Sequence, residues 1–469
     1  MHILKQQWFG NIRADILAGI VVGLALIPEA LAFAFIVGVD PRVALYASFT
    51  IAVITAFVGG RPGLISAATG AMALVLVSLM ASHGLQYVLA ATILTGLIQF
   101  ILGIFGVANL MRFIPNSVML GFVNALGIMI FITQMPYLIG RGMMTYIFAA
   151  VTLILVYVIP RFIKVIPAPL IAIIVMTSIA LVSGVKLQSI GDLGTMPSTL
   201  PTFFFPDIPI NLETLKIILP YSLALSIVGL LESLLTSQVL DDMTDTESNK
   251  NTEARGQGIA NFINGFFGGM AGCALIGQSV INVKSGGRGR LSTFTAGVFL
   301  MFLIIVLGDV VANIPMPVLV GVMIMVSFTT FNWSSFKFMV QAPKSETLVM
   351  IITVAIILYT QNLAIGVVIG VILSALFFVA KISRVTVTKE NAEYKVKGPL
   401  FFASTTKFMK SFADVDESTI IINFEDSHLW DESAVGALLK LTQQLEEKGV
   451  TVHIQGLNTS SEQLYQQFT

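Results

Sequence analysis

The sequence has few charged residues, a single cysteine and no net charge. Lys, Arg, Asp and Glu make up 11% of its 469 residues, and 26 basic side chains balance 26 acidic ones. Soluble domains usually carry about 25% charged residues, so this composition excludes an ordinary soluble protein. The balanced charge leaves no basic surface for nucleic acid. Cys273 has no second cysteine with which to form an intrachain disulfide, and it belongs to no Cys/His cluster that could bind a metal.

Apolar residues are abundant instead. Hydrophobic residues make up 56% of the chain, and the mean hydropathy is +0.89. Apolar runs bounded by charge, Pro or Gly divide residues 11–381 into about fourteen segments of membrane length. The N-terminus has no small-residue cleavage site after a short apolar run, so we expect the first span to be retained as the insertion signal. The sequence therefore predicts a polytopic, all-α membrane protein.

The basic residues predict an orientation for these segments. If all fourteen cross the membrane from a cytoplasmic start, fifteen of the nineteen Lys and Arg before Val385 lie on the cytoplasmic side. The other four are Arg42, Arg141, Lys186 and Lys216. This distribution follows the positive-inside rule. We expect a multi-pass protein of the plasma (inner) membrane with both termini in the cytoplasm.

One apolar run, Leu219–Thr244, contains a carboxylate near its middle, Glu232. An ionisable group at membrane depth costs about 2.5–3.5 kcal/mol, so it normally faces the protein interior or a wet cavity. Thr236 follows one turn later on the same helix face. These oxygen groups can hold Na⁺, or the carboxylate can hold a proton. The alternative is a structural glutamate bound to neighbouring hydroxyl groups.

Two short segments are interrupted by small and polar residues. Gly63–Ala81 is apolar only in its second half, which predicts an extended lead-in and a half-helix beginning near Thr69 and Gly70. Cys273–Gly287 carries Gln278, Ser279 and Asn282 inside a span. Interrupted segments in corresponding positions of two halves indicate a transporter with seven-plus-seven inverted repeats. Between the Glu232 span and the second interrupted segment, the charged stretch Asp241–Gly258 is typical of a solvated loop.

Half-helices that meet head to head form an anion site without a basic side chain, because their free N–H groups and positive dipole ends converge. The alternative is that the small residues only allow tight helix packing. The anion-binding residues predicted from this pattern are Thr69, Gly70, Leu275, Ile276, Gly277, Gln278 and Ser279.

The C-terminal part of the chain changes character. A β-rich run at Thr419–Phe424, a helical stretch at Ser433–Gly449 and a second β-rich run at Val450–Leu457 predict a small α/β domain. We therefore place a transmembrane domain at residues 1–383 and a cytoplasmic domain at residues 384–469.

Several of these motifs resemble the SulP (sulfate permease) family of anion transporters: LIPEALAFA, SAATGAM, LLESLLTSQVLDDMT and GQGIANFINGFFGG. The tail is similar to STAS domains through WDESAVGAL. The resemblance implies a uracil-transporter-like fold in which a core domain moves against a gate domain, and it implies a homodimer. It names no cytoplasmic partner for the STAS-like tail.

Within this family the chain is similar to the bicarbonate transporters. Their Na⁺ site uses a carboxylate and a threonine four residues later in the eighth span, with a threonine of the third span. Glu232, Thr236 and Thr69 occupy the matching positions, and we add Ala274 to the predicted coupling site. The bicarbonate transporters carry aspartate where this chain has Glu232, and glutamate resembles proton-coupled members. The coupling ion is therefore Na⁺ or H⁺, and no other cofactor is expected.

Many relatives carry arginine where this chain has Gln278. The missing charge weakens a site for a divalent anion more than one for a monovalent anion, which favours bicarbonate slightly over sulfate. In the tail, Glu432 follows Asp431 where related anti-sigma antagonists carry a phosphorylated serine, so that modification is not expected. Ser433 is an alternative phosphorylation site. The alternative is that these residues only cap the N-terminus of a helix, which accounts for their presence in the sequence without any modification.

The sequence thus predicts a cation-coupled transporter of a small inorganic anion that works by alternating access. An enzyme is not expected, because the sequence shows no nucleophile–base pair and no metal cluster. An uncoupled exchanger or channel, a nucleobase permease of the same fold and a signalling receptor stay open as alternatives.

Overall fold

The computed structural model describes residues 2–163 and 166–468, with only the backbone described for residues 2–4 and 110–112. These residues form two compact units, one up to Gly370 and one from Val371. The division falls inside helix α16 (Leu363–Ile382), whereas the sequence placed the domain boundary just beyond the end of that helix.

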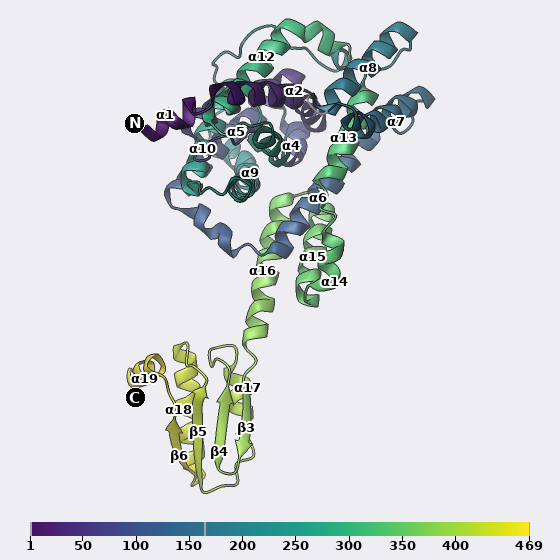
Figure 1. The fold of residues 1–469 in the computed structure, drawn as a ribbon. Helices are drawn as coiled ribbons and strands as arrows, with labels where there is room; N and C mark the ends of the chain where they lie inside the picture. The colour runs from purple at the N-terminus through teal and green to yellow at the C-terminus, as the bar shows by residue number, and fades with distance from the viewer. Residues whose placement is uncertain (1, 164–165, 469) are drawn as a thin grey trace. The chain divides into compact units, whose positions relative to one another are not determined.

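The first unit is helical (Figure 1). Its α-helices are α1 (His2–Phe9), α2 (Ile12–Val37), α3 (Pro41–Val58), α4 (Gly70–His83), α5 (Leu85–Ile104), α6 (Asn116–Gln134), α7 (Met143–Val158), α8 (Ala168–Ser183), α9 (Leu212–Thr244), α10 (Lys250–Phe266), α11 (Ile276–Lys284), α12 (Arg290–Ala312), α13 (Met316–Thr330), α14 (Ser335–Gln341), α15 (Lys344–Thr360) and the start of α16. Four 3₁₀ turns are η1 (Val107–Phe113), η2 (Met135–Tyr137), η3 (Ile159–Arg161) and η4 (Ile190–Asp192).

Nine helical segments within the described residues are long and apolar enough to cross a membrane, judged by length and composition. Helices α4 and α8 are apolar but shorter. The structure therefore has the helical membrane-type fold that the sequence predicts. The count of fourteen spans and the inverted repeat stay predictions.

The helices of the first unit pack in two groups. Helices α2, α3, α4, α5, α9, α10 and α12 contact one another, and helices α6, α7, α8, α13 and α15 contact one another. Glycines allow the close approach of α5 and α10. A Cβ atom at Gly96 would lie 2.6 Å from the carbonyl oxygen of Gly258, so neither helix has room for a side chain at this crossing. We name the two sets the α2–α9 group and the α6–α13 group.

The second unit contains a four-stranded sheet in the order β3-β4-β5-β6. Strands β3 (Thr386–Glu390) and β4 (Glu393–Lys397) are antiparallel, and β5 (Thr419–Asp426) and β6 (Thr451–Gln455) continue the sheet in parallel. The helices are α17 (Thr405–Lys410), α18 (Glu432–Glu447) and α19 (Thr459–Gln466). The predicted strand, helix and strand are confirmed. Asp431 caps α18 by accepting a 2.9 Å hydrogen bond from the Ala434 amide, as the capping interpretation requires.

The prediction of a solvated loop at residues 241–258 is wrong in its extent, because only residues 245–249 connect the two helices. Helix α9 continues to Thr244, and α10 already begins at Lys250. Asp241, Lys250 and Glu253 are bonded within the protein, whereas Asp242, Asp245 and Glu247 are exposed. Glu253 is 1% exposed, and its carboxylate accepts hydrogen bonds of 2.7 and 3.0 Å from the amides of Gly60 and Arg61. Because these partners lie far away in the sequence, the local charge pattern resembled that of an exposed loop.

Candidate functional site

The two interrupted segments meet in a small antiparallel sheet. Strand β1 (Ser66–Ala68) pairs with β2 (Gly272–Ala274), with Ser66 opposite Ala274 and Ala68 opposite Gly272. Each strand leads directly into a short helix, β1 into α4 and β2 into α11. Helix α4 begins at Gly70, as the sequence predicts. The sheet therefore joins the N-termini of two half-helices that are about 200 residues apart in the chain.

The N-terminus of α11 is open. Leu275 precedes it without a side-chain cap, and the amides of Ile276, Gly277 and Gln278 have no hydrogen-bond partner in residues 2–163 and 166–468. Gly277 is exposed, and a Cβ atom there would meet nothing within 4 Å. Three free donors and the positive end of a helix dipole therefore meet at a helix tip that is exposed at Gly277, which is an arrangement that binds anions.

The N-terminus of α4 is covered. Thr69 caps it weakly, since its Oγ1 accepts a 3.4 Å hydrogen bond from the Met72 amide. Gly70 is buried, and a Cβ atom there would lie 3.0 Å from the Phe33 ring and 3.2 Å from the Ile130 side chain. Phe33 belongs to α2 and Ile130 to α6, so both helix groups contribute to this cover.

Two of the predicted anion ligands are already bonded to the lead-in of β1. The Leu275 amide donates a 2.9 Å hydrogen bond to the Ile65 carbonyl oxygen. The Ser279 hydroxyl accepts a 3.0 Å hydrogen bond from the Ile65 amide. These groups hold α11 against the small sheet, so the donors left for an anion on this helix are those of Ile276, Gly277 and Gln278.

Gln278 has a partner that the sequence reasoning missed. Its side chain is 5% exposed, and its Nε2 donates a hydrogen bond to the carboxylate of Glu29 on α2. Glu29 lies in the LIPEALAFA run and is half-buried. The signal that could have found it is the one that identified Glu232, an ionisable residue within an apolar span.

Glu232 is 7% exposed and lies beside β2. Its Oε2 accepts a hydrogen bond of 3.0 Å from the Cys273 thiol, and the same sulfur lies 3.1 Å from Oγ1 of Thr69. The thiol therefore bridges two of the predicted coupling residues. Sequence reasoning had considered this cysteine only for disulfide and metal chemistry.

The other predicted coupling residues lie close by. The Thr236 hydroxyl donates a 2.7 Å hydrogen bond to the Glu232 carbonyl oxygen, which leaves its oxygen lone pairs available. The Ala274 amide donates to the Ser233 hydroxyl at 3.0 Å. Helix α9 is thus hydrogen-bonded to β2 through two adjacent residues, Glu232 to Cys273 and Ser233 to Ala274.

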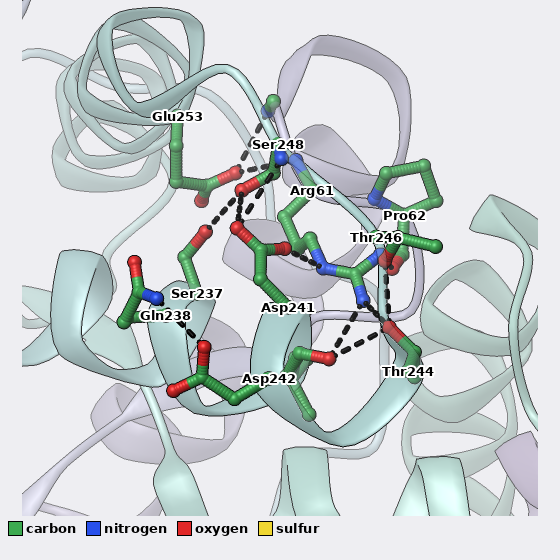
Figure 2. A network of polar contacts seen from close by, with 12 residues as sticks. Arg61, Pro62, Ser237, Gln238, Asp241, Asp242, Thr244, Thr246, Ser248 and Glu253 are labelled. Atoms are coloured by element: carbon green, nitrogen blue, oxygen red, sulfur yellow. Dashed lines mark hydrogen bonds and ion pairs between the residues drawn. The ribbon is translucent and has the colours of Figure 1, made fainter.

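A buried ionic network fixes the far end of α9 (Figure 2). Asp241 follows Glu232 by about two and a half helical turns. One of its oxygens lies 2.8 Å from Arg61 Nε and the other 2.6 Å from Lys250 Nζ. Burial lowers the pKa of the Arg61 guanidinium, and the Asp241 carboxylate opposes that shift. The network ties the lead-in to β1, the end of α9 and the start of α10 together.

A cavity of about 510 Å³ lies between the two helix groups near this network. Leu234, Leu235 and Gln238 of α9 form one side, and Met119 of α6 forms another. The remaining lining residues are Ala108, Asn109 and Lys250. The α2–α9 and α6–α13 groups are therefore not packed tightly against each other here.

Comparison with known proteins identifies the family. Residues 12–143 and 141–353 match the Sulfate permease family, and residues 383–469 match the STAS domain. The chain is 56% identical to Putative sulfate transporter YbaR of Bacillus subtilis (strain 168) over 470 residues, covering 99% of this chain and 98% of that protein.

Two solved structures have a similar fold. The transmembrane domain of a cyanobacterium bicarbonate transporter BicA superimposes with a TM-score of 0.67 at 25% identity, over 78% of this chain and 98% of that one. The murine Slc26a9 anion transporter in the inward-facing state superimposes with a TM-score of 0.82 at 18% identity, over 98% of this chain and 88% of that one. The matched segments include both half-helices and the Glu232 helix, and the chain belongs to the sulfate permease family of anion transporters and ends in a STAS domain.

Proposed function

We propose that the protein is a secondary active transporter of a small inorganic anion, sulfate or bicarbonate, coupled to a cation. The similarity of the chain to Putative sulfate transporter YbaR and to the bicarbonate transporter BicA supports this pair of substrates. The observation that carries the proposal is the open N-terminus of α11, joined through β2 to the buried carboxylate of Glu232.

The anion is held by the amides of Ile276, Gly277 and Gln278. A helix N-terminus carries about half a positive charge, and free amides aimed at an anion need no basic side chain. The α4 N-terminus at Thr69 and Gly70 adds donors when its cover opens. Ile130 is the part of that cover that belongs to α6, so a movement of the α6–α13 group against the α2–α9 group uncovers this half of the site. This movement is the alternating-access step.

Glu232 couples the anion to a cation. An ionised carboxylate near the anion opposes its binding, and a bound cation or proton removes that repulsion. The protein then changes between its outward-facing and inward-facing states only when the site is empty or holds both the anion and the cation. The group that contacts the carboxylate is a thiol, and sulfur is a soft ligand that suits Na⁺ poorly. This contact favours a proton over Na⁺ as the coupling ion.

The test is uptake of labelled sulfate and labelled bicarbonate into proteoliposomes with an imposed pH or Na⁺ gradient. We expect the wild-type protein to accumulate one of the two anions against its gradient when a pH gradient is imposed. Glu232→Gln should abolish accumulation while the protein stays folded. Asp242→Asn is the matched control, because it removes an exposed carboxylate from the same helix. Accumulation by Glu232→Gln at the wild-type level refutes the coupling role.

The same assay separates the rival functions. Flux that ignores both gradients indicates an uncoupled exchanger or channel. Uptake of labelled uracil in the same vesicles, with no competition from sulfate or bicarbonate, indicates a nucleobase permease. Ligand binding without transport indicates a receptor.

We further propose that the protein is a homodimer of the plasma (inner) membrane with both termini in the cytoplasm. The Lys and Arg distribution along the chain supports the orientation. Labelling of cysteines introduced near each terminus, from either side of the membrane, tests the orientation of the termini.

A further inference from the structure

One face of α2 reaches the N-termini of both half-helices. Glu29 and Phe33 lie four residues apart and therefore on the same helix face. Phe33 contacts the start of α4 beside Gly70, and the Glu29 carboxylate accepts a hydrogen bond from Gln278 in the first turn of α11. A titratable group thus lies at the tip where we place the anion.

We propose that Glu29 is a second proton-binding residue, located inside the anion site, and that the anion binds α11 only when Glu29 carries a proton. This inference rests on the proposed function, because it assumes that the tip of α11 is the anion site. It assigns to Glu29 a role separate from that of Glu232, which lies on another helix and bonds to Cys273.

Proximity is the first reason. The Gln278 side-chain amide has two N–H groups, and it donates to the Glu29 carboxylate. An anion bound by the free backbone amides of the same helix turn therefore lies close to that carboxylate.

Charge is the second reason. An ionised Glu29 repels an anion across a site that is partly shielded from water, where the repulsion is stronger than in bulk solvent. A proton taken from solution removes the charge and turns the carboxyl into a hydrogen-bond donor. The neutral carboxyl can then donate its O–H to the anion instead of repelling it. When the anion leaves, Gln278 is free to bond to the carboxylate again and the proton returns to solution.

Other charged groups lie away from Glu29. Helix α2 packs against β1 and against α3, α4, α8, α11, α12 and α13. Neither β1, α8 nor α13 has a charged residue. Apart from Glu29, the charged residues and the histidine on α2 itself and on the other packed helices lie near the helix ends: Arg13, Asp15, Arg42, His83, Lys284, Arg290 and Asp309. The one tyrosine of these helices within the described residues, Tyr46 of α3, donates its hydroxyl to the Thr199 carbonyl oxygen. The pH dependence of the anion site is therefore assigned to Glu29 and to Glu232 on α9.

The experiment measures the dissociation constant of labelled sulfate for the purified full-length protein over a series of pH values. Sulfate keeps its charge over this range, so only the protein titrates. Each proton that must be bound before the anion can bind weakens wild-type binding by up to about tenfold per pH unit above the pKa of the group. Glu29→Gln, which mimics the protonated acid, should reduce this slope by one proton and bind sulfate more tightly than wild type at the highest pH.

Two further variants make the result specific. Glu232→Gln should keep the proton linkage of Glu29, and the double variant should lose it. Glu29→Ala removes the same proton and must flatten the slope in the same way, which keeps the test valid if Glu29→Gln is poorly folded. A slope in Glu29→Gln and Glu29→Ala equal to that of wild type overturns the inference while leaving the proposed function intact. A wild-type protein that neither binds nor transports sulfate or bicarbonate overturns the proposed function itself.

Discussion

Asp241 is a carboxylate shared by two cations, and its replacement tests how the coupling helix is held in place. The Asp241 and Arg61 side chains are each 9% exposed and that of Lys250 is 23% exposed. Asp241→Leu leaves both cations without their carboxylate. Lys250→Met leaves the Arg61–Asp241 pair intact. Both substitutions remove the Asp241–Lys250 ion pair. Asp241→Leu leaves two cations without a carboxylate, whereas Lys250→Met leaves no charge unpaired.

The expected magnitudes follow from burial. Removing one partner of a buried ion pair typically costs about 3–5 kcal/mol, because the other charge is left uncompensated. We expect Asp241→Leu to fall in this range, since it also removes the acceptor of two hydrogen bonds from Ser248. Lys250→Met should cost about 1 kcal/mol, because the more exposed lysine is screened by water and Arg61 still neutralises the carboxylate. Arg61→Met should lie between the two.

The assay is thermal unfolding of the purified full-length protein in detergent at one fixed heating rate, since membrane proteins of this size often unfold irreversibly. Asp241→Leu should give the lowest midpoint, followed by Arg61→Met and then Lys250→Met. Asp242→Asn is the control, because its exposed neighbouring carboxylate bonds only to Gln238 among the described residues. Equal midpoints for Asp241→Leu and Lys250→Met refute the reasoning.

Two further predictions concern the site itself. Cys273→Ser places a hard oxygen between Thr69 and Glu232, so we expect anion uptake to gain a dependence on Na⁺. Replacing Na⁺ by choline in the uptake assay would reveal this dependence. If uptake by the variant is as independent of Na⁺ as uptake by wild type, the thiol does not determine which ion is coupled. Gly277→Ala adds a methyl group where no other atom lies within 4 Å, so it should leave the melting midpoint unchanged while weakening anion binding several-fold. Gly272→Ala is the contrasting variant, because its Cβ would clash with the Ala67 carbonyl oxygen and should lower the midpoint. A Gly277→Ala protein that binds the anion as wild type does would move the anion away from this helix tip.

Much of the fold could be predicted from local pattern. The apolar run at Leu219–Thr244 lies within helix α9, which ends at Thr244. The half-helix predicted to begin near Thr69 and Gly70 does begin there. These predictions succeed because backbone groups in a membrane must be satisfied within their own segment, so span lengths and breaks are set by residues adjacent in the chain. The same holds for the cap of Asp431 on α18, which involves neighbours three residues apart.

Contacts between distant segments could not be predicted in this way. The stretch 241–258 looked solvated because Arg61, which neutralises Asp241, lies in another segment. The Cys273 thiol was considered alone, although it bridges Thr69 and Glu232. Leu275 and Ser279 were predicted to bind the anion, although both are bonded to Ile65.

The sequence by itself determined that this is a membrane protein with two interrupted half-helices and a carboxylate buried in an apolar span. It did so because the cost of placing charges and unpaired backbone groups in a membrane leaves a pattern in the local composition. The tertiary structure decided which groups each of these features touches: Cys273 for Glu232, Gln278 for Glu29, and no partner among the described residues for the amides at the start of α11. Hydrogen bonds act over about 3 Å, and chain order does not say which distant residues come that close.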